Sequence, residues 1–132
     1  MGDEPIFIGP YPQTEQDIQK MFEGGVTGVF NVQTEIDHDH RGIDWPRMCS
    51  YYAERGIEAV HYPIHDFNSV DLTAKLYGAA CTLNQMINER GRAVYVHCTA
   101  GMGRAPASVL VYLCLFRQME PDQALAFCKS HR

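Results

Sequence analysis

Residues 94–106, VYVHCTAGMGRAP, join a short apolar run to a loop with two glycines and then to a longer apolar segment. The apolar run is rich in β-branched and aromatic residues, which predicts a buried strand that ends close to Cys98. Gly101 and Gly103 relax the steric limits on the loop, and Pro106 suits the first turn of a helix. Backbone N–H groups in such a loop, at the N-terminus of a helix, bind anions. The stretch therefore predicts a phosphate-binding loop between a strand and a helix.

Two reactive side chains bracket this loop: Cys98 and, six positions later, Arg104. The loop N–H groups and the helix dipole favour the thiolate form of a cysteine, which is a strong nucleophile. Arg104 presents a planar fork of donors that can hold two phosphate oxygens. We expect Cys98 to attack phosphorus and form a cysteinyl-phosphate, without a metal or another cofactor. The residues expected to bind the phosphate are Thr99, Ala100, Gly101, Met102, Gly103 and Arg104.

A second cysteine shows how much this context matters. Cys49 precedes Arg55 at the same spacing, but the stretch between them has no glycine, and its pattern predicts a helix that cannot surround an anion. The strand, the glycines and the following apolar helix distinguish Cys98 from Cys49. The alternative, that Cys98 is an inert buried thiol, is less favoured for the same reason.

Cleavage of a phosphate ester also needs an acid to protonate the leaving oxygen, and later a base to activate water. Asp66 follows a predicted strand, 57–64, which should end at the same sheet edge as Cys98. We therefore assign both roles to Asp66, against the alternative that it only caps or solvates a turn. Asp71 is expected instead to cap a long helix.

Strands and helices alternate along the whole chain. The expected strands cover 6–8, 26–32, 57–64 and 93–96, and the expected helices begin near Thr14, Asp44, Asp71, Ala105 and Pro121. This order predicts an α/β fold with a central, mainly parallel sheet of about four to five strands and helices on both faces. The site then lies at the carboxyl ends of the strands.

Residues 33–42 separate two of these elements and are predominantly polar. Their core, Asp37-His38-Asp39-His40, allows two interpretations, a metal site or a solvated loop. Neighbouring side chains on a short polar run rarely converge on one ion, so the solvated loop is the favoured interpretation.

Composition narrows the class of protein. The chain of 132 residues is long enough for one domain with a substantial core. Its formal net charge of −5 and 11 scattered basic residues do not suggest a nucleic-acid partner. Its longest apolar stretch, 105–116, is too short for membrane insertion. Five cysteines, an odd number, are typical of reduced thiols in an intracellular, reducing compartment.

His97-Cys98 together with Arg104 resembles the active-site loop of the dual-specificity and protein tyrosine phosphatase superfamily. The segment 98–104, CTAGMGR, is similar to the glucan phosphatase branch, which includes laforin and the plant starch-excess phosphatases. The resemblance implies a dual-specificity phosphatase-like catalytic domain over residues 1–132. It implies that Asp66-Phe67 is the general-acid loop and that His97 orients the nucleophile loop by hydrogen bonding.

The same resemblance implies a substrate: phosphate monoesters on a starch-like or glycogen-like glucan. Phe67 and Met102 match positions at which the family contacts the glucan. Trp45 and Tyr11 lie in predicted loops and are weaker candidates, because aromatic residues near helix starts more often belong to the core. His40 and Arg41 depart from the aromatic residues that plant members tend to carry there.

Several properties stay open at this stage. The main rival is a dual-specificity phosphatase for phosphoprotein or phosphoinositide, which would use the same catalytic residues. The rival of another class is a noncatalytic phosphoglucan-binding module. The compartment is expected to be the cytoplasm or the plastid stroma. We expect no carbohydrate-binding module in this chain; the oligomeric state and a truncation of the domain at its C-terminus are undecided.

Overall fold

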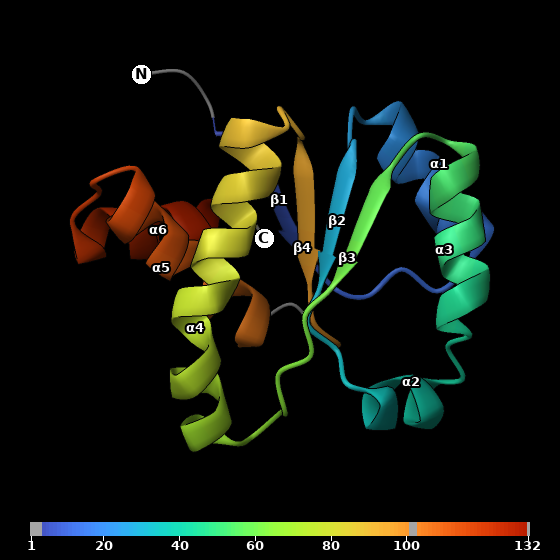
Figure 1. Ribbon diagram of the computed structural model, residues 1–132, viewed down its shortest axis with the longest axis horizontal. Helices are drawn as coiled ribbons and strands as arrows, with labels where there is room; N and C mark the ends of the chain where they lie inside the picture. Colours follow the sequence, from blue (N-terminus) through green and yellow to red (C-terminus); the bar gives the residue numbers. More distant parts are fainter. Residues whose placement is uncertain (1–3, 101–102, 132) are drawn as a thin grey trace.

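Four parallel strands form the centre of the computed structural model, which describes residues 4–100 and 103–131 (Figure 1). The strands are β1 (Ile6–Gly9), β2 (Gly28–Asn31), β3 (Glu58–His61) and β4 (Val94–His97), in the spatial order β1-β4-β2-β3. All neighbouring pairs in this order are parallel. The predicted parallel sheet is confirmed, although β2 and β3 are shorter than the stretches expected from the sequence.

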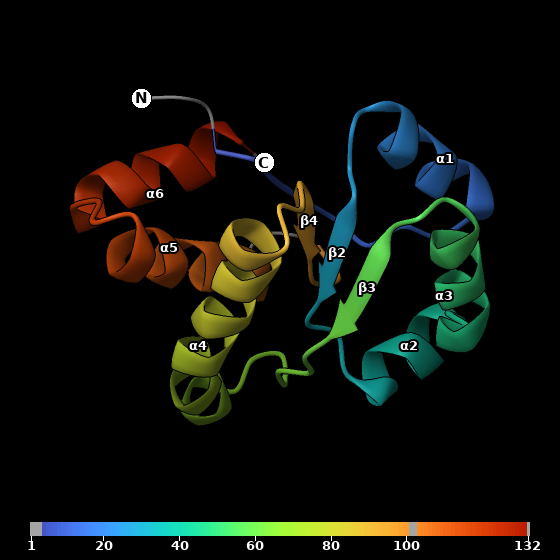
Figure 2. The ribbon, with the colours of Figure 1, turned by 45° about the horizontal axis from the view of Figure 1, so that its top comes forward.

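Helices cover both faces of the sheet, as predicted. They are α1 (Glu15–Glu23), α2 (Glu35–Arg41), α3 (Trp45–Glu54), α4 (Ser69–Asn84), α5 (Arg104–Phe116) and α6 (Pro121–Ser130), and α4 continues into a π-helical turn, η1 (Gln85–Glu89). Figures 1 and 2 show α4, α5 and α6 on one side of the sheet and α1 and α3 on the other. The short helix α2 lies beyond the carboxyl ends of β2 and β3 (Figure 1). No helix in the described part of the chain is both long and apolar enough to cross a membrane.

The alternation of side chains along the strands divides the core in two. Phe30 and Val96 pack into the larger cluster, together with Val109 and Leu113 of α5. Val29 points to the opposite face and packs against the residues of α1 and α3. Burial of one large apolar side chain contributes roughly 1.5–3 kcal/mol, so α5 is held mainly by its apolar contacts. The predicted buried helix after the nucleophile loop is therefore confirmed.

Two sequence predictions about helix starts were wrong. The stretch predicted as a solvated loop contains α2, because Thr34 caps a helix and forms a reciprocal capping box with Asp37. The long helix α4 is capped by Asn68, whose side chain accepts a hydrogen bond from the N–H of Asp71. Asp71 instead accepts a hydrogen bond from the N–H of His65 at 2.7 Å and so fastens the preceding loop to α4.

Candidate active site

The carboxyl ends of the strands lie side by side, which brings the loops after them together. Gly9, His97, Asn31 and His61 occupy one row across the sheet. A pocket of about 240 Å³ at this edge is lined by Asp66, Phe67, Cys98, Ala100, Gly103 and Arg104. A pocket of about 470 Å³ adjoins it and shares Asp66, Phe67, Gly103 and Arg104. The fold thus places the three residues predicted for catalysis in one pocket.

Cys98 directly follows β4 and is buried, with 3% of its surface exposed. The loop after it ends where α5 begins at Arg104, with Gly103 as the N-cap residue. Ala100 and Gly103 are exposed on the pocket side, whereas Thr99 is half-buried. Gly101 and Met102, predicted to bind phosphate, lie outside the described residues. The N-terminus of α5 therefore lies next to the cysteine, as an anion-binding loop requires.

His97, which precedes Cys98 in the sequence, is buried. Its Nδ1 atom lies 3.2 Å from the carbonyl oxygen of Cys98, and because a carbonyl can only accept, Nδ1 carries the proton. Burial lowers the pKa of His97 to about 3, so the ring is neutral at physiological pH. A neutral ring that binds the loop backbone suits the expected orienting role, and Nε2 has no hydrogen-bond partner among the described residues.

The guanidinium of Arg104 is held through Nη1, whereas its Nε atom has no hydrogen-bond partner among the described residues. Its Nη1 atom donates to a carboxylate oxygen of Asp37 and to the carbonyl of Ile64, both at 2.7 Å. Its Nη2 atom lies 3.6 Å from a carboxylate oxygen of Asp66. The Nε atom is buried and has no hydrogen-bond partner among the described residues. Nε and Nη2 form the edge that can grip two oxygens of one phosphate.

Asp37 is a site residue that sequence reasoning missed. It belongs to α2, and the same oxygen that meets Arg104 also accepts hydrogen bonds from the backbone N–H and the hydroxyl of Thr34. Partial burial acts to raise the pKa of Asp37, but the bonds from Arg104 and Thr34 outweigh it and hold the pKa below its usual value. The pattern Thr34-x-x-Asp37 is a capping signal that identifies the helix, although nothing in it reveals the contact with Arg104.

Asp66 and Phe67 come from the loop between β3 and α4. The Asp66 carboxylate is 40% exposed in the pocket and accepts a hydrogen bond from the N–H of Phe67. Phe67 has a left-handed backbone, with φ at 54°, and its side chain is fully exposed. The loop thus places a carboxyl group and an aromatic ring at the mouth of one pocket, as the sequence predicted.

A buried polar chain connects β2 and β3 to the nucleophile loop. Gln33 is 1% exposed; its side-chain amide donates to the hydroxyl of Thr99 at 3.1 Å, and its carbonyl accepts a hydrogen bond from Nε2 of His61. Asn31 donates to Nε2 of His38 and accepts from the N–H of Gln33. Sequence reasoning missed these residues, because the partners of Gln33 lie on β3 and in the loop after β4, far away in the sequence.

Trp45 lies in a separate environment. Its indole stacks on the imidazole of His38, with ring centroids 5.6 Å apart, and His38 in turn stacks on His61. These three rings, with the carboxylates of Glu35 and Asp39, line a pocket of about 380 Å³. His38 is buried, so the predicted solvated loop was wrong here as well. Burial and then the neighbouring charge of His61 lower the pKa of His38. Within residues 4–100 and 103–131, no cluster of His, Cys, Asp or Glu is arranged to hold a metal ion.

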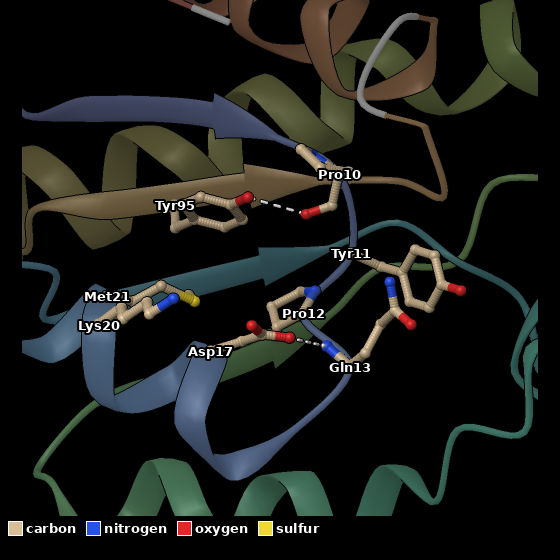
Figure 3. Close-up of a pocket in the computed structure, with 8 residues that line it drawn as sticks. All are labelled: Pro10, Tyr11, Pro12, Gln13, Asp17, Lys20, Met21 and Tyr95. Carbon is tan, nitrogen blue, oxygen red and sulfur yellow. Dashed lines mark hydrogen bonds between the residues drawn. The ribbon is translucent and has the colours of Figure 1, made fainter.

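Tyr11 also lies outside the pocket that contains Cys98, although its backbone N–H donates to the carbonyl of Thr99. Figure 3 shows the pocket of about 290 Å³ that it lines, between the β1–α1 loop and α1. The hydroxyl of Tyr95 closes one side by donating to the carbonyl of Pro10 at 2.8 Å. Of the four residues predicted to contact glucan, Phe67 lines the pocket that contains Cys98, Trp45 and Tyr11 line other pockets, and Met102 is outside the described residues.

Comparison with known proteins identifies the family of the chain. The family described as "Dual specificity phosphatase, catalytic domain" matches residues 6–132. Phosphoglucan phosphatase DSP4, amyloplastic, of Castanea sativa is 35% identical over 109 residues, which cover 82% of this chain and 29% of that protein. Laforin of Mus musculus is 34% identical over 119 residues, which cover 82% of this chain and 36% of that protein. The chain therefore spans only about a third of the length of these relatives.

Solved structures resemble the fold at lower sequence identity. PTPMT1 superposes with a TM-score of 0.73 at 20% identity, covering 98% of this chain and 80% of that one. Tk-PTP in its active form superposes with a TM-score of 0.70, also at 20% identity, covering 98% and 81% of the two chains. Similarity at this level shows that the fold is shared.

Proposed function

The chain belongs to the family of dual specificity phosphatase catalytic domains, and from this membership and the pocket geometry we propose that it is a cysteine-dependent glucan phosphatase. It removes phosphate monoesters from a starch-like or glycogen-like polysaccharide. The observation that carries the proposal is the pocket that holds Cys98, Arg104 and Asp66 together at the N-terminus of α5. Phosphoglucan phosphatase DSP4 and laforin, at 35% and 34% identity, support the choice of a glucan.

In the first half-reaction, the thiolate of Cys98 attacks phosphorus. The S–P bond forms while the bond from phosphorus to the sugar oxygen breaks, and the protonated carboxyl of Asp66 gives its proton to that oxygen. The Nε and Nη2 atoms of Arg104 and the loop N–H groups hold the three non-bridging oxygens as their charge is redistributed. The glucan leaves with a free hydroxyl group.

In the second half-reaction, water hydrolyses the cysteinyl-phosphate. The carboxylate of Asp66 takes a proton from water, a new O–P bond forms, and the S–P bond breaks to release inorganic phosphate and restore the thiolate of Cys98. Residue 105 is alanine and offers no hydroxyl to assist this step. The cycle uses protein groups and water, so we expect no cofactor.

Recognition of the glucan is assigned first to Phe67, whose exposed ring at the pocket mouth offers a face to a sugar ring. Recognition of the glucan is assigned next to Met102, because of its sequence position between Cys98 and Arg104. Trp45 and Tyr11, which line separate pockets, would contact sugars farther from the phosphate.

Charge around the pocket weighs against the phosphoinositide rival. Among the described residues that line the two adjoining pockets, Arg104 is the only lysine or arginine. A ligand with several phosphate groups needs more cationic partners than one. A noncatalytic phosphoglucan-binding module does not need a nucleophile and an acid in one pocket, which argues against that rival too. The expected compartment remains the cytoplasm or the plastid stroma, and the amyloplastic relative supports a plastid.

The deciding experiment measures phosphate release by the purified protein from phosphorylated amylopectin, a phosphotyrosine peptide and a phosphoinositide at matched phosphate concentration. Cys98→Ser serves as the blank. We expect the highest kcat/KM with amylopectin. A higher kcat/KM with the peptide or the lipid would overturn the glucan assignment and leave the catalytic mechanism intact, whereas no release above the blank from any substrate would contradict the mechanism.

A further inference from the structure

We propose that Asp37 is a positioning residue for Arg104: it holds Nη1 so that Nε and Nη2 remain available to the phosphate. The proposal rests on the proposed phosphatase function, but not on the identity of the substrate. Arg104 is 4% exposed, and its contact with Asp37 at 2.7 Å is much shorter than its approach to Asp66 at 3.6 Å. The guanidinium is thus held from the side of α2, away from the pocket.

The carboxylate of Asp37 is itself rigidly placed. Its Oδ2 atom accepts the N–H of Thr34 at 2.8 Å and the hydroxyl of Thr34 at 3.1 Å, in addition to Nη1 of Arg104. The bond from the N–H of Thr34 is part of the capping box that begins α2. The start of α2 and the guanidinium therefore share one oxygen atom, and the orientation of Arg104 depends on the position of this helix.

The position of Arg104 between Asp37 and Asp66 matters for the proposed reaction. Asp66 is the other carboxylate near Arg104 in the described part of the chain, and it is also the proposed general acid. Without the charge of Asp37, the guanidinium would turn toward Asp66 and shorten its 3.6 Å contact with that carboxylate. The edge that should grip phosphate would then be occupied by the general acid. Asp37 keeps the phosphate-binding group and the proton donor separate.

A matched control exists within the chain. Asp17 occupies the same position in the capping box of α1, where it accepts hydrogen bonds from the N–H groups of Gln13 and Thr14 and makes no contact with Arg104. Asp37→Asn and Asp17→Asn therefore remove the same charge from the same local motif. A purely structural role for both residues predicts equal effects on the site.

The experiment measures the inhibition constant for inorganic phosphate, and kcat and KM for p-nitrophenyl phosphate, at a temperature at which circular dichroism shows every variant folded. We expect Asp37→Asn to weaken phosphate binding about 10- to 100-fold, the usual effect of losing a charge-assisted hydrogen bond, and Asp17→Asn to change it less than about twofold. Asp37→Glu, which restores the charge, should recover part of the affinity. Phosphate binding that is unchanged in Asp37→Asn would overturn the proposal.

A double-mutant cycle tests whether Asp37 acts through Arg104. In an Arg104→Lys background, Asp37→Asn should weaken phosphate binding less than about threefold, because the oriented fork is already lost. Equal losses in both backgrounds would contradict the proposal. If Asp37→Asn does not fold, Thr34→Ala replaces it: both charges stay, one bond to Oδ2 is lost, and we expect about threefold weaker phosphate binding. An unchanged inhibition constant in that variant would then overturn the proposal. If the protein prefers a substrate other than glucan, these measurements are unaffected.

Discussion

Two helices of this protein begin with nearly the same four residues, Thr14-Glu15-Gln16-Asp17 at α1 and Thr34-Glu35-Ile36-Asp37 at α2. In both, the threonine is the N-cap, its hydroxyl accepts the N–H of the aspartate at 3.2 Å, and the aspartate accepts the N–H of the threonine. The local structure is the same because the local chemistry is the same.

The surroundings of the two aspartates differ. The capping bonds of Asp17 lie at the exposed surface of α1, whereas Asp37 meets a buried arginine at the edge of the sheet. The difference arises from the sheet. The strand before α2 is β2, which pairs in parallel with β4, so the start of α2 lies near the loop that follows β4. A capping motif therefore fixes where a helix starts, and the sheet topology decides whether its carboxylate also takes part in a site.

The largest expected effect tests whether the chemistry lies beside α2 at all. Cys98→Ser removes the thiolate but keeps the loop N–H groups and Arg104, so turnover of p-nitrophenyl phosphate should disappear while inorganic phosphate still binds. Turnover is followed by the release of p-nitrophenol, and binding by calorimetric titration. Turnover at the wild-type rate in this variant would remove Cys98 from the mechanism.

The next largest effect concerns the second carboxylate near Arg104. Asp66→Ala should lower kcat roughly 10²- to 10⁴-fold, the usual loss for a general acid. The loss of kcat should be smaller with a substrate whose leaving group needs no proton. Comparing kcat for aryl phosphates of decreasing leaving-group pKa measures this dependence. A loss that is the same for all leaving groups would assign Asp66 a purely structural role.

A third test concerns the acid stability that depends on the buried His97 at the carboxyl end of β4. Because burial depresses the pKa of His97 to about 3, the unfolded chain binds a proton below pH 6.5 that the folded chain does not. The contribution of neutral His97 to the free energy of unfolding is therefore complete above pH 6.5. It decreases as the pH falls toward 3, by at most about 1.4 kcal/mol per pH unit. Urea unfolding of the wild type and His97→Asn between pH 4 and 7 should show the steeper decline in the wild type. Parallel curves would contradict a neutral buried His97.

The smallest effect compares the two caps directly. Thr14→Ala and Thr34→Ala should each cost about 1 kcal/mol of unfolding free energy, typical for a lost N-cap. Only Thr34→Ala should also raise the KM for p-nitrophenyl phosphate, because only the cap of α2 holds the carboxylate that holds Arg104. Chemical denaturation and steady-state kinetics measure the two quantities on the same samples. A KM that rises equally in both variants would contradict the distinction drawn between the caps.

The nucleophile loop and the fold could be predicted from the sequence because their signals are local. A β-rich run, glycines and an apolar segment predict the strand and the helix on either side of the Cys98 loop, and the lack of glycine after Cys49 predicts the helix, α3, that contains it. The alternation of strands and helices then gives the parallel sheet. In these parts of the chain, each residue's neighbours in sequence determine its structure.

The rest depends on contacts between distant segments. The polar residues of α2 suggested a solvated loop, yet Asp37 and His38 are held by Arg104 and by aromatic rings from α3 and β3. Asp71 is of a residue type that often caps helices, but Asn68 lies at the helix start and is the N-cap residue. The contacts of Asp37 and His38 depend on the register of the strands, which no short window of sequence contains. The choice between Asn68 and Asp71, by contrast, is local, because the two residues lie three positions apart and the side chain of Asn68 accepts the N–H of Asp71.

The backbone of Phe67 has a consequence for engineering. A left-handed conformation costs a residue with a side chain roughly 1–2 kcal/mol, and glycine adopts it without that cost. The exposed ring buries no apolar surface in return, so folding alone would favour glycine at this position. Phe67→Gly should then make the protein more heat-resistant and a poorer phosphatase on polymeric substrate. Position 67 is thus a place where selection for thermal tolerance and selection for activity would choose different amino acids.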